Sequence, residues 1–433
     1  MTENTRNLLS FLSESPSCFH AVENLRNLLT EAGYTELTET ARWELHPGGK
    51  YFTTRNGSSI LAFRVPEGRI RGFMMAAAHS DSPGFKVKEH AEKVSAGCVQ
   101  LETEKYGGGL LATWFDRPLS VAGRLLVRQD GKLVTKLVNI DRDLLIIPSV
   151  AIHMNRAAND GWKIQPNIDT LPLYGSEDAK DSFMGTAAAA AGVEKENILG
   201  SDLFLYVRQP GTVLGAQEEL IAAPKLDDLE CAWSLMQGFL AAEGSEAIPV
   251  CCIFDNEEVG SETKQGAASN LLRDTLRRIA LSLDFDEEGY LQMLGGSFLV
   301  SADNAHAQHP NHPEYADSLN CPRMNGGIVV KFNANQKYTT DAVSCAVFRT
   351  VCEDAGVPVQ VYANRSDMAG GSTLGSIANT KVAVPTVDIG LAQLAMHSCY
   401  ETAGAQDLDS LVTMAKTLFS KALWAEDGTY RII

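Results

Sequence analysis

The sequence has no apolar run of the roughly 18 to 20 residues that a membrane-spanning helix requires, so we expect no transmembrane segment. Its first residues, MTENTRNLLSFLSESPS, are polar and mixed in charge, unlike a secretory signal peptide. The nine cysteines are scattered and include no Cys-x-x-Cys pair. This usage is typical of free thiols in a reducing compartment, so we expect a cytoplasmic protein.

Basic residues are also scarce, because 37 Lys and Arg against 54 Asp and Glu leave a formal net charge of −17. This charge argues against nucleic acid and against anionic membranes as partners, since both are polyanions. The sequence also lacks a Gly-x-Ser-x-Gly elbow, a His-Glu-x-x-His motif, a Gly-x-Gly-x-x-Gly loop and a P-loop. A serine hydrolase, a zincin and a nucleotide-binding enzyme are therefore disfavoured.

The length of 433 residues exceeds one ordinary domain and suggests two. Apolar strands alternate with helices before residue 91 and after residue 223, which predicts an α/β fold with a mostly parallel sheet flanked by helices. Residues 91–223 instead contain short alternating segments such as RLLVRQDGKLVTKLVNI, typical of antiparallel hairpins. We therefore predict one domain at 1–90 plus 224–433, with a mainly antiparallel β domain inserted at 91–223.

Local signals predict several elements within these domains. Residues 3–33 indicate two helices separated at Pro16, the second ended by Gly33. The dipeptides Asn56-Gly57 and Asp130-Gly131 predict hairpin turns. Four apolar runs predict buried strands, and they end at His79, Phe254, Asp303 and Gly390.

Histidines and carboxylates collect at the ends of these runs or at the starts of the helices that follow. Parallel strands bring their carboxyl ends to one edge of the sheet, where ligands bind. Carboxylates gathered there repel one another unless cations neutralise them, and mixed His and carboxylate ligands suit Zn, Mn or Co, particularly as a bridged pair. Each motif alone is more often a cap or a solvated surface, so the hypothesis rests on their joint occurrence. The residues are His79, Asp81, Asp227, Asp228, Asp255, Glu257, Glu258, Asp303, His306 and His397.

Nine motifs, in order along the whole chain, resemble those of the M18 aspartyl aminopeptidase family of metallopeptidases, and a bacterial member is expected. These motifs are MMAAAHSDSPGFKVK, YGGGLLATWFDRPLSVAGR, IPSVAIHMNR, APKLDDLECAWS, FDNEEVGSETKQGA, SADNAHAQHPNHPEY, GGIVVKFNANQKYTTDA, GGSTLGSIA and LAMHSCYETAG.

The resemblance implies a co-catalytic two-metal aminopeptidase, in which a metal-bridging water attacks the peptide bond and releases the N-terminal residue. The cofactors implied are two divalent ions per subunit, Zn or alternatively Mn or Co. The implied roles are His79 and Asp303 for one ion, Glu258 and His397 for the other, Asp227 as the bridge, Asp81 as the residue that orients His79, and Glu257 as the general base.

The resemblance also implies a substrate preference and an assembly. The family acts on peptides with a free N-terminal Asp or Glu, and Lys331 matches the lysine that recognises the acidic side chain. Tyr338 and His153 are further candidate substrate contacts, and His153 would reach the active site of a neighbouring subunit. The inserted domain would be the dimerisation domain, from which dimers assemble a tetrahedral homododecamer.

Some positions and alternatives stay open at this point. The family commonly has Asn where this sequence has Asp228, and Asp255 has no assigned role. The resemblance assigns no metal to His306, His309 or His312, which are interpreted as loop residues. An aminopeptidase of broader or neutral specificity, or a catalytically silent shell or cargo protein on the same fold, are the alternative functions.

Overall fold

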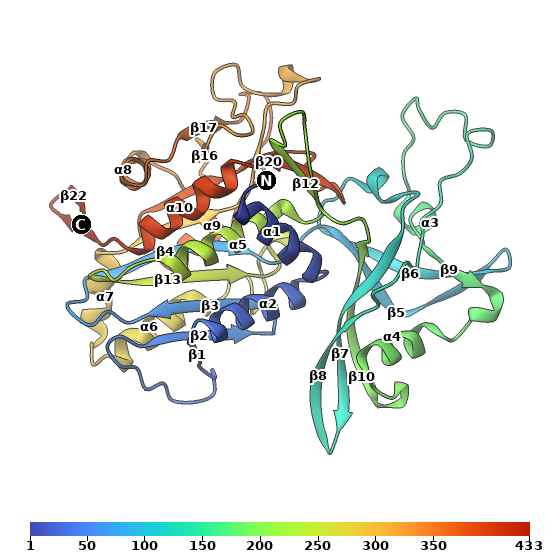
Figure 1. Cartoon of the computed structure of the whole chain (residues 1–433), viewed down its shortest axis with the longest axis horizontal. Coiled ribbons are helices and arrows are strands. Elements are labelled where there is room, and N and C mark those ends of the chain that lie inside the picture. Colours follow the sequence, from blue (N-terminus) through green and yellow to red (C-terminus); the bar gives the residue numbers. More distant parts are fainter.

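The computed structural model describes residues 1–433, and its main body is built on a nine-stranded sheet (Figure 1). The four central strands, β13, β4, β14 and β18, run parallel, whereas β3 and β16 are antiparallel neighbours on either side. The expected mostly parallel sheet is therefore confirmed at its centre. The strands in order are β1 (Thr35–Glu36), β2 (Lys50–Arg55), β3 (Ser59–Arg64), β13 (Ala247–Phe254), β4 (Gly72–His79), β14 (Phe298–Ala302), β18 (Thr386–Gly390), β16 (Ile328–Phe332) and β17 (Val359–Ala363).

Helices cover both faces of this sheet, which explains why its central strands are continuously apolar: all eight residues of β4 are buried. One face packs against α1 (Glu3–Glu14), α2 (Cys18–Glu31), α5 (Leu226–Ala241), α8 (Ala342–Ala355) and α10 (Asp407–Phe419). The other face packs against α6 (Leu271–Ser282), α7 (Glu287–Gly295) and α9 (Leu374–Asn379).

The predicted helix ends and turns are confirmed. Pro16 lies between α1 and α2, and Gly33 adopts a left-handed φ of +80° just after α2. Asn56 and Gly57 join β2 to β3 with φ values of 59° and 65°, as a type I′ hairpin turn requires. Asp130 and Gly131 connect another hairpin in the same way.

A six-stranded antiparallel sheet projects from the main body (Figure 1) and has a hydrophobic core of its own. Its strands are β8 (Lys132–Asn139), β7 (Leu119–Gln129), β10 (Ile198–Val207), β5 (Gly84–Ser95), β6 (Cys98–Tyr106) and β9 (Leu173–Ser176), accompanied by α3 (Pro166–Asp169) and α4 (Phe183–Ala191). Because β5 already begins at Gly84, the sheet does not start at residue 91; the division of the chain into domains at 91 and 223 stays a prediction.

A separate five-stranded sheet pairs segments that are distant in the sequence. Its strands, in order, are β11 (Thr212–Leu214), β12 (Leu220–Ala223), β20 (Glu401–Gly404), β19 (Ala392–Leu394) and β15 (Ala305–His306). A C-terminal hairpin consists of β21 (Leu423–Glu426) and β22 (Thr429–Ile432).

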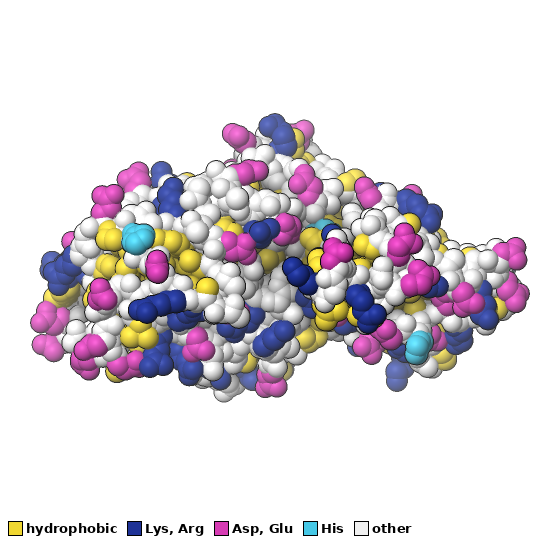
Figure 2. Space-filling model, turned by 90° about the horizontal axis from the view of Figure 1, so that it is seen from below, with side chains coloured by type: hydrophobic (Ala, Val, Ile, Leu, Met, Phe, Trp, Pro, Cys, Tyr) yellow, Lys and Arg dark blue, Asp and Glu magenta, His cyan; other side chains and the backbone are white.

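Seen from below, the surface is hollowed between the main body and the six-stranded sheet, with Lys and Arg side chains around the hollow (Figure 2). No helix is both long and apolar enough to cross a bilayer.

Candidate metal centre

The carboxyl ends of the central strands converge as the sequence predicts. His79 is the last residue of β4 and pairs with Phe254 at the end of β13, while Asp303 follows β14 on the opposite side of β4. The remaining residues come from three connections: Asp227 from the first turn of α5, Glu257 and Glu258 from a 3-10 turn after β13, and His397 from the loop between β19 and β20.

The ligand atoms form groups in which all atoms lie within 4.8 Å of one another. His79 and Asp303 share one group with Asp227 and Asp228, whereas Glu258 and His397 share another with Asp227. His79 Nε2 lies 3.5 Å from Asp227 Oδ1, and His397 Nε2 lies 3.5 Å from Asp227 Oδ2 and 3.4 Å from Glu258 Oε2. Two ligands of one tetrahedral ion, each about 2.0–2.2 Å from it, are separated by roughly 3.3–3.5 Å.

Unpartnered carboxylate oxygens indicate that a cation fits here. Asp227 Oδ1, Asp228 Oδ1 and Glu258 Oε1 are buried without a hydrogen-bond donor, which is costly in a protein interior. Burial raises the pKa of Glu258 well above its usual range and that of Asp303 to about 6, although Lys331 opposes the shift of Asp303. Divalent cations would relieve this crowding of carboxylates and restore their ionised form.

Asp81 fixes the orientation of His79. Its carbonyl oxygen lies 3.1 Å, and its Oδ1 3.3 Å, from His79 Nδ1, which leaves Nε2 directed at the ligand groups. The Asp81 carboxylate accepts hydrogen bonds from the Tyr106 hydroxyl (2.6 Å) and from the backbone N–H groups of Glu257 (3.1 Å) and Glu258 (3.2 Å). Asp81 therefore links the strand that carries His79 to the turn that carries both glutamates.

The two adjacent glutamates differ in their surroundings. Glu258 belongs to the group with Asp227 and His397. Glu257 is not in that group, and its carboxylate forms a group only with His79 and Glu258. Burial raises the pKa of Glu257 to about 8, and the negative charge of Asp303 adds to that rise. A carboxylate beside the ligand groups, with an affinity for protons near neutral pH, has the properties of a general base.

A cavity of about 120 Å³, here called the metal cavity, opens onto these residues and is also lined by Lys331, Tyr338 and Tyr362. Lys331 is only 2% exposed; its ammonium donates to the carbonyl oxygens of Asp303 (2.6 Å) and Asn304 (3.3 Å) and lies 5.2 Å from the centre of the Tyr338 ring. His153 does not line this cavity and lies on an exposed loop of the same subunit. Its contact with a neighbouring subunit stays a prediction.

Asp228, the departure from the family pattern, lies against His79, a predicted ligand. Its Oδ2 accepts the backbone N–H of His79 at 3.2 Å, a bond that the Asn of the family pattern could also accept. Burial raises the pKa of Asp228 well above its usual range, which favours a neutral carboxyl of similar shape to the amide. Asp228 therefore supports the position of His79.

The other histidines lie outside the ligand groups. His306 is the last residue of β15 and lines the metal cavity, so its interpretation as a loop residue is wrong. The strand was missed because two residues give no periodicity. His309 and His312 lie in the connection that follows β15, as expected.

Sequence reasoning missed two polar partners of the cluster. Tyr106 ends β6 of the six-stranded sheet and donates to Asp81, and no motif in the sequence connects the two. Glu401 accepts the backbone N–H of Asp227 at 3.0 Å and that of His397 at 2.7 Å. Its only signal was its place four residues after His397, in MHSCYE.

Comparisons with known proteins show the family of this chain. The profile of the family described as Aminopeptidase I zinc metalloprotease (M18) matches residues 11–419. The "Probable M18 family aminopeptidase 2" of Clostridium acetobutylicum is 47% identical over 414 residues, which cover 94% of this chain and 96% of that protein.

Solved structures of similar fold cover nearly the whole chain. The structure of the Ape4 and Nbr1 complex superposes with a TM-score of 0.92 at 34% identity, covering 96% of this chain and 85% of the other. The S. cerevisiae mApe1 dodecamer gives a TM-score of 0.85 at 27% identity and covers 96% of both chains. The chain therefore belongs to the M18 family of zinc metalloprotease aminopeptidases.

Proposed function

We propose that this chain is a co-catalytic two-metal aminopeptidase that releases N-terminal Asp or Glu from peptides. The proposal rests on one observation above all, namely that two groups of ligand atoms share Asp227. A carboxylate that belongs to both groups is suited to bridge two cations. His79 and Asp303 would hold one ion, and Glu258 and His397 the other. Zn is the ion of the family, and Mn or Co would suit the same ligands.

Glu257 is the proposed general base. The two ions, when bound, would activate a water molecule and polarise the scissile carbonyl. Glu257 accepts a proton from the attacking water and returns it to the leaving amine. Its burial, which raises its pKa to about 8, favours holding that proton between the two steps, whereas bound cations oppose the rise because they favour the ionised carboxylate.

A charge argument supports the preference for acidic residues. The metal cavity is lined by four carboxylates, those of Asp227, Glu257, Glu258 and Asp303, and two divalent ions would neutralise them. The ammonium of Lys331 would then remain as the excess positive charge of the wall, and an acidic substrate side chain would compensate it.

An alternative role for Lys331 follows from its contacts. Its ammonium lies 3.8 Å from Asp303 Oδ2 and donates to the Asp303 carbonyl, so it could serve the metal ligand rather than the substrate. In that case the enzyme would have the broader or neutral specificity named above as an alternative, because no other Lys or Arg lines the cavity.

The activity is tested by hydrolysis of Asp-, Glu-, Leu- and Ala-peptides with and without chelator. We expect cleavage that chelation abolishes and metal restores, and a loss of at least about 1,000-fold in Glu257→Gln, which keeps the shape but cannot take a proton. Glu262→Gln, an exposed glutamate a few residues away, is the matched control and should retain activity. A folded, metal-loaded protein that cleaves none of the peptides would favour the silent-shell alternative.

The specificity is tested by Lys331→Met with Lys331→Arg as the charge-retaining control. If Lys331 recognises the substrate, loss of a charge-assisted hydrogen bond of about 2–3 kcal/mol lowers kcat/KM for Asp- and Glu-peptides about 30- to 150-fold and leaves Leu-peptides unchanged. An equal loss for all substrates, together with weaker metal binding, would instead assign Lys331 to the support of Asp303.

We also propose a homo-oligomer, with the inserted region 91–223 as its dimerisation domain and a tetrahedral dodecamer as the particle. The related mApe1 is a dodecamer, and the loop that carries His153 exposes Val150 (48%), Ile152 (48%) and Met154 (78%), which is typical of an interface. Light scattering distinguishes a 46.8 kDa monomer from a twelvefold larger particle.

A cytoplasmic location is also proposed. All nine cysteines are free thiols, which supports it.

A further inference from the structure

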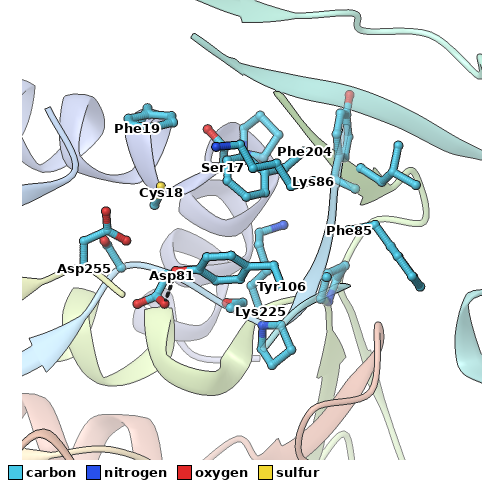
Figure 3. A pocket seen from close by; sticks show the side chains of 18 of the residues that line it. Ser17, Cys18, Phe19, Asp81, Phe85, Lys86, Tyr106, Phe204, Lys225 and Asp255 are labelled. Atoms are coloured by element: carbon cyan, nitrogen blue, oxygen red, sulfur yellow. Dashed lines mark hydrogen bonds between the residues drawn. The ribbon is translucent and has the colours of Figure 1, made fainter. Parts of the chain in front are cut away.

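A second cavity, of about 330 Å³, lies between the main body and the six-stranded sheet (Figure 3); we call it the rear cavity. It shares only Asp227 with the metal cavity. Its volume is within the range of pockets that hold small organic ligands. Its wall contains Ser17, Cys18 and Phe19 from the region of α2, Lys86, Tyr106 and Phe204 from the six-stranded sheet, and Asp81, Lys225 and Asp255 from the main body.

Aromatic side chains form much of this wall. Phe19 and Phe204 lie above Tyr106 in the view of Figure 3, and the rings of Tyr106 and Phe204 meet edge to face at 5.5 Å between centroids. Trp114 and Phe85 extend the aromatic surface and pack against each other at 5.2 Å. Such a wall favours a flat apolar group in the cavity.

Most charged groups of the wall have a polar partner. Asp202 accepts from Lys86 (2.7 Å) and Arg124 (2.8 Å), and Asp81 is engaged by Tyr106. Asp255 accepts the backbone N–H of Asn256 and lies on the far side of the cavity from Phe204 (Figure 3).

Two lysines of the wall lack a partner: Lys264, which is exposed to solvent, and Lys225, which is half-buried. The Lys225 ammonium makes no hydrogen bond, and no carboxylate lies within ion-pair distance. The Glu401 carboxylate also lines the cavity, but both its oxygens accept backbone N–H groups of Asp227 and His397. A half-buried ammonium without a partner beside an aromatic wall is suited to a ligand that brings its own negative charge.

We propose that the rear cavity binds a small amphipathic carboxylate, with the carboxylate on Lys225 and the apolar body against Phe19, Tyr106 and Phe204. This site is separate from the proposed peptide-binding cavity and does not depend on the proposed peptidase activity.

The proposal is tested on the metal-loaded protein by the alkylation rate of Cys18, which lines the rear cavity and is partly exposed. The probe is 3-phenylpropionate, and its uncharged isostere 3-phenylpropionamide is the control ligand. Peptide-resolved mass spectrometry after N-ethylmaleimide treatment reports each thiol, and Cys98 and Cys321, partly exposed elsewhere, are internal controls. We expect the carboxylate to protect Cys18 alone, at concentrations about tenfold or more below those of the amide.

Variants assign the protection to the proposed contacts. Lys225→Met should make the acid and the amide equally weak, and Lys225→Arg should restore the difference. Phe204→Ala, on the six-stranded sheet away from the metal ligands, should weaken both ligands about fivefold and stays informative if Lys225→Met fails to fold. Lys331→Met should change neither, because Lys331 lines only the metal cavity.

Three results would overturn the proposal. The first is that the carboxylate does not protect Cys18, and the second is that the amide protects it equally well in the wild-type protein. The third is that protection is lost in Lys331→Met but kept in Lys225→Met. The last result would place the carboxylate at the metal centre.

Discussion

Glu401 holds two of the proposed metal ligands, Asp227 and His397, in place. Its Oε2 accepts the backbone N–H of Asp227 at 3.0 Å and its Oε1 that of His397 at 2.7 Å, and the residue is 1% exposed. These ligands come from α5 and from the loop before β20, which are far apart in the sequence. We predict that Glu401→Gln weakens metal binding.

The magnitude follows from the two hydrogen bonds. The amide nitrogen of Gln cannot accept a hydrogen bond, whichever way the side chain is turned, so one backbone N–H faces another donor. Loss of a hydrogen bond to a charged group costs about 1.5–3 kcal/mol. Without ions the two ligands can move apart to relieve this contact, whereas metal binding requires both in place. The cost therefore falls on the bound state and lowers metal affinity about 10- to 100-fold.

The assay is competition for Zn with a chromophoric chelator, followed by activity at saturating metal. Glu230→Gln is the matched control, because Glu230 is a buried carboxylate on α5 whose side chain accepts only from Asn304. We expect a weaker affinity in Glu401→Gln alone, with kcat largely recovered at high metal. Unchanged affinity in Glu401→Gln, or the same loss in Glu230→Gln, would refute the reasoning.

Three further predictions concern the cluster and its surroundings. Tyr106→Phe removes the donor to Asp81 and should lower stability by about 1–2 kcal/mol, measured by denaturant unfolding beside wild type. Chelation should lower the melting temperature, because each ion at 100 times its Kd stabilises the folded state by about 2.7 kcal/mol, and calorimetry with and without Zn checks this. Burial lowers the pKa of His20 to about 4, so its neutral form stabilises the fold above the unfolded-state pKa near 6.5 and this contribution is lost as the pH falls towards 4. Between pH 7.5 and pH 4, the free energy of unfolding of His20→Gln should therefore fall by about 2–3 kcal/mol less than that of wild type. Parallel curves of unfolding free energy against pH would contradict the assignment.

The elements predicted from the sequence are those with local physical causes. β4 and β13 are continuous apolar runs that end in polar residues, and Asn56-Gly57 has the turn chemistry of a hairpin. The five-stranded sheet has no comparable cause, since its strands are two to four residues long and β12 pairs with β20 across most of the C-terminal half of the chain. Such pairings depend on tertiary structure and leave no period in the sequence.

The same distinction applies to the site. The residues that collect at strand ends, such as His79 and Asp303, could be found because a parallel sheet places its carboxyl ends together. Tyr106 and Glu401 could not, because they reach the cluster from other sheets through hydrogen bonds that leave no pattern in the sequence. The start of the six-stranded sheet at Gly84 was hidden for a related reason: β5 continues almost directly from the strand that ends at His79.

The acidic turn after β13 serves two cavities. Asn256 adopts a left-handed φ of 62°, which reverses the chain between Asp255 and Glu257. Asp255 consequently lines the rear cavity, while Glu257 and Glu258 line the metal cavity. Separation thereby reduces the repulsion among these carboxylates, and cations held by the ligand groups would reduce it further. Because the Asp81 carboxylate accepts the N–H groups of both glutamates and also lines the rear cavity, this turn is the physical connection between the two sites.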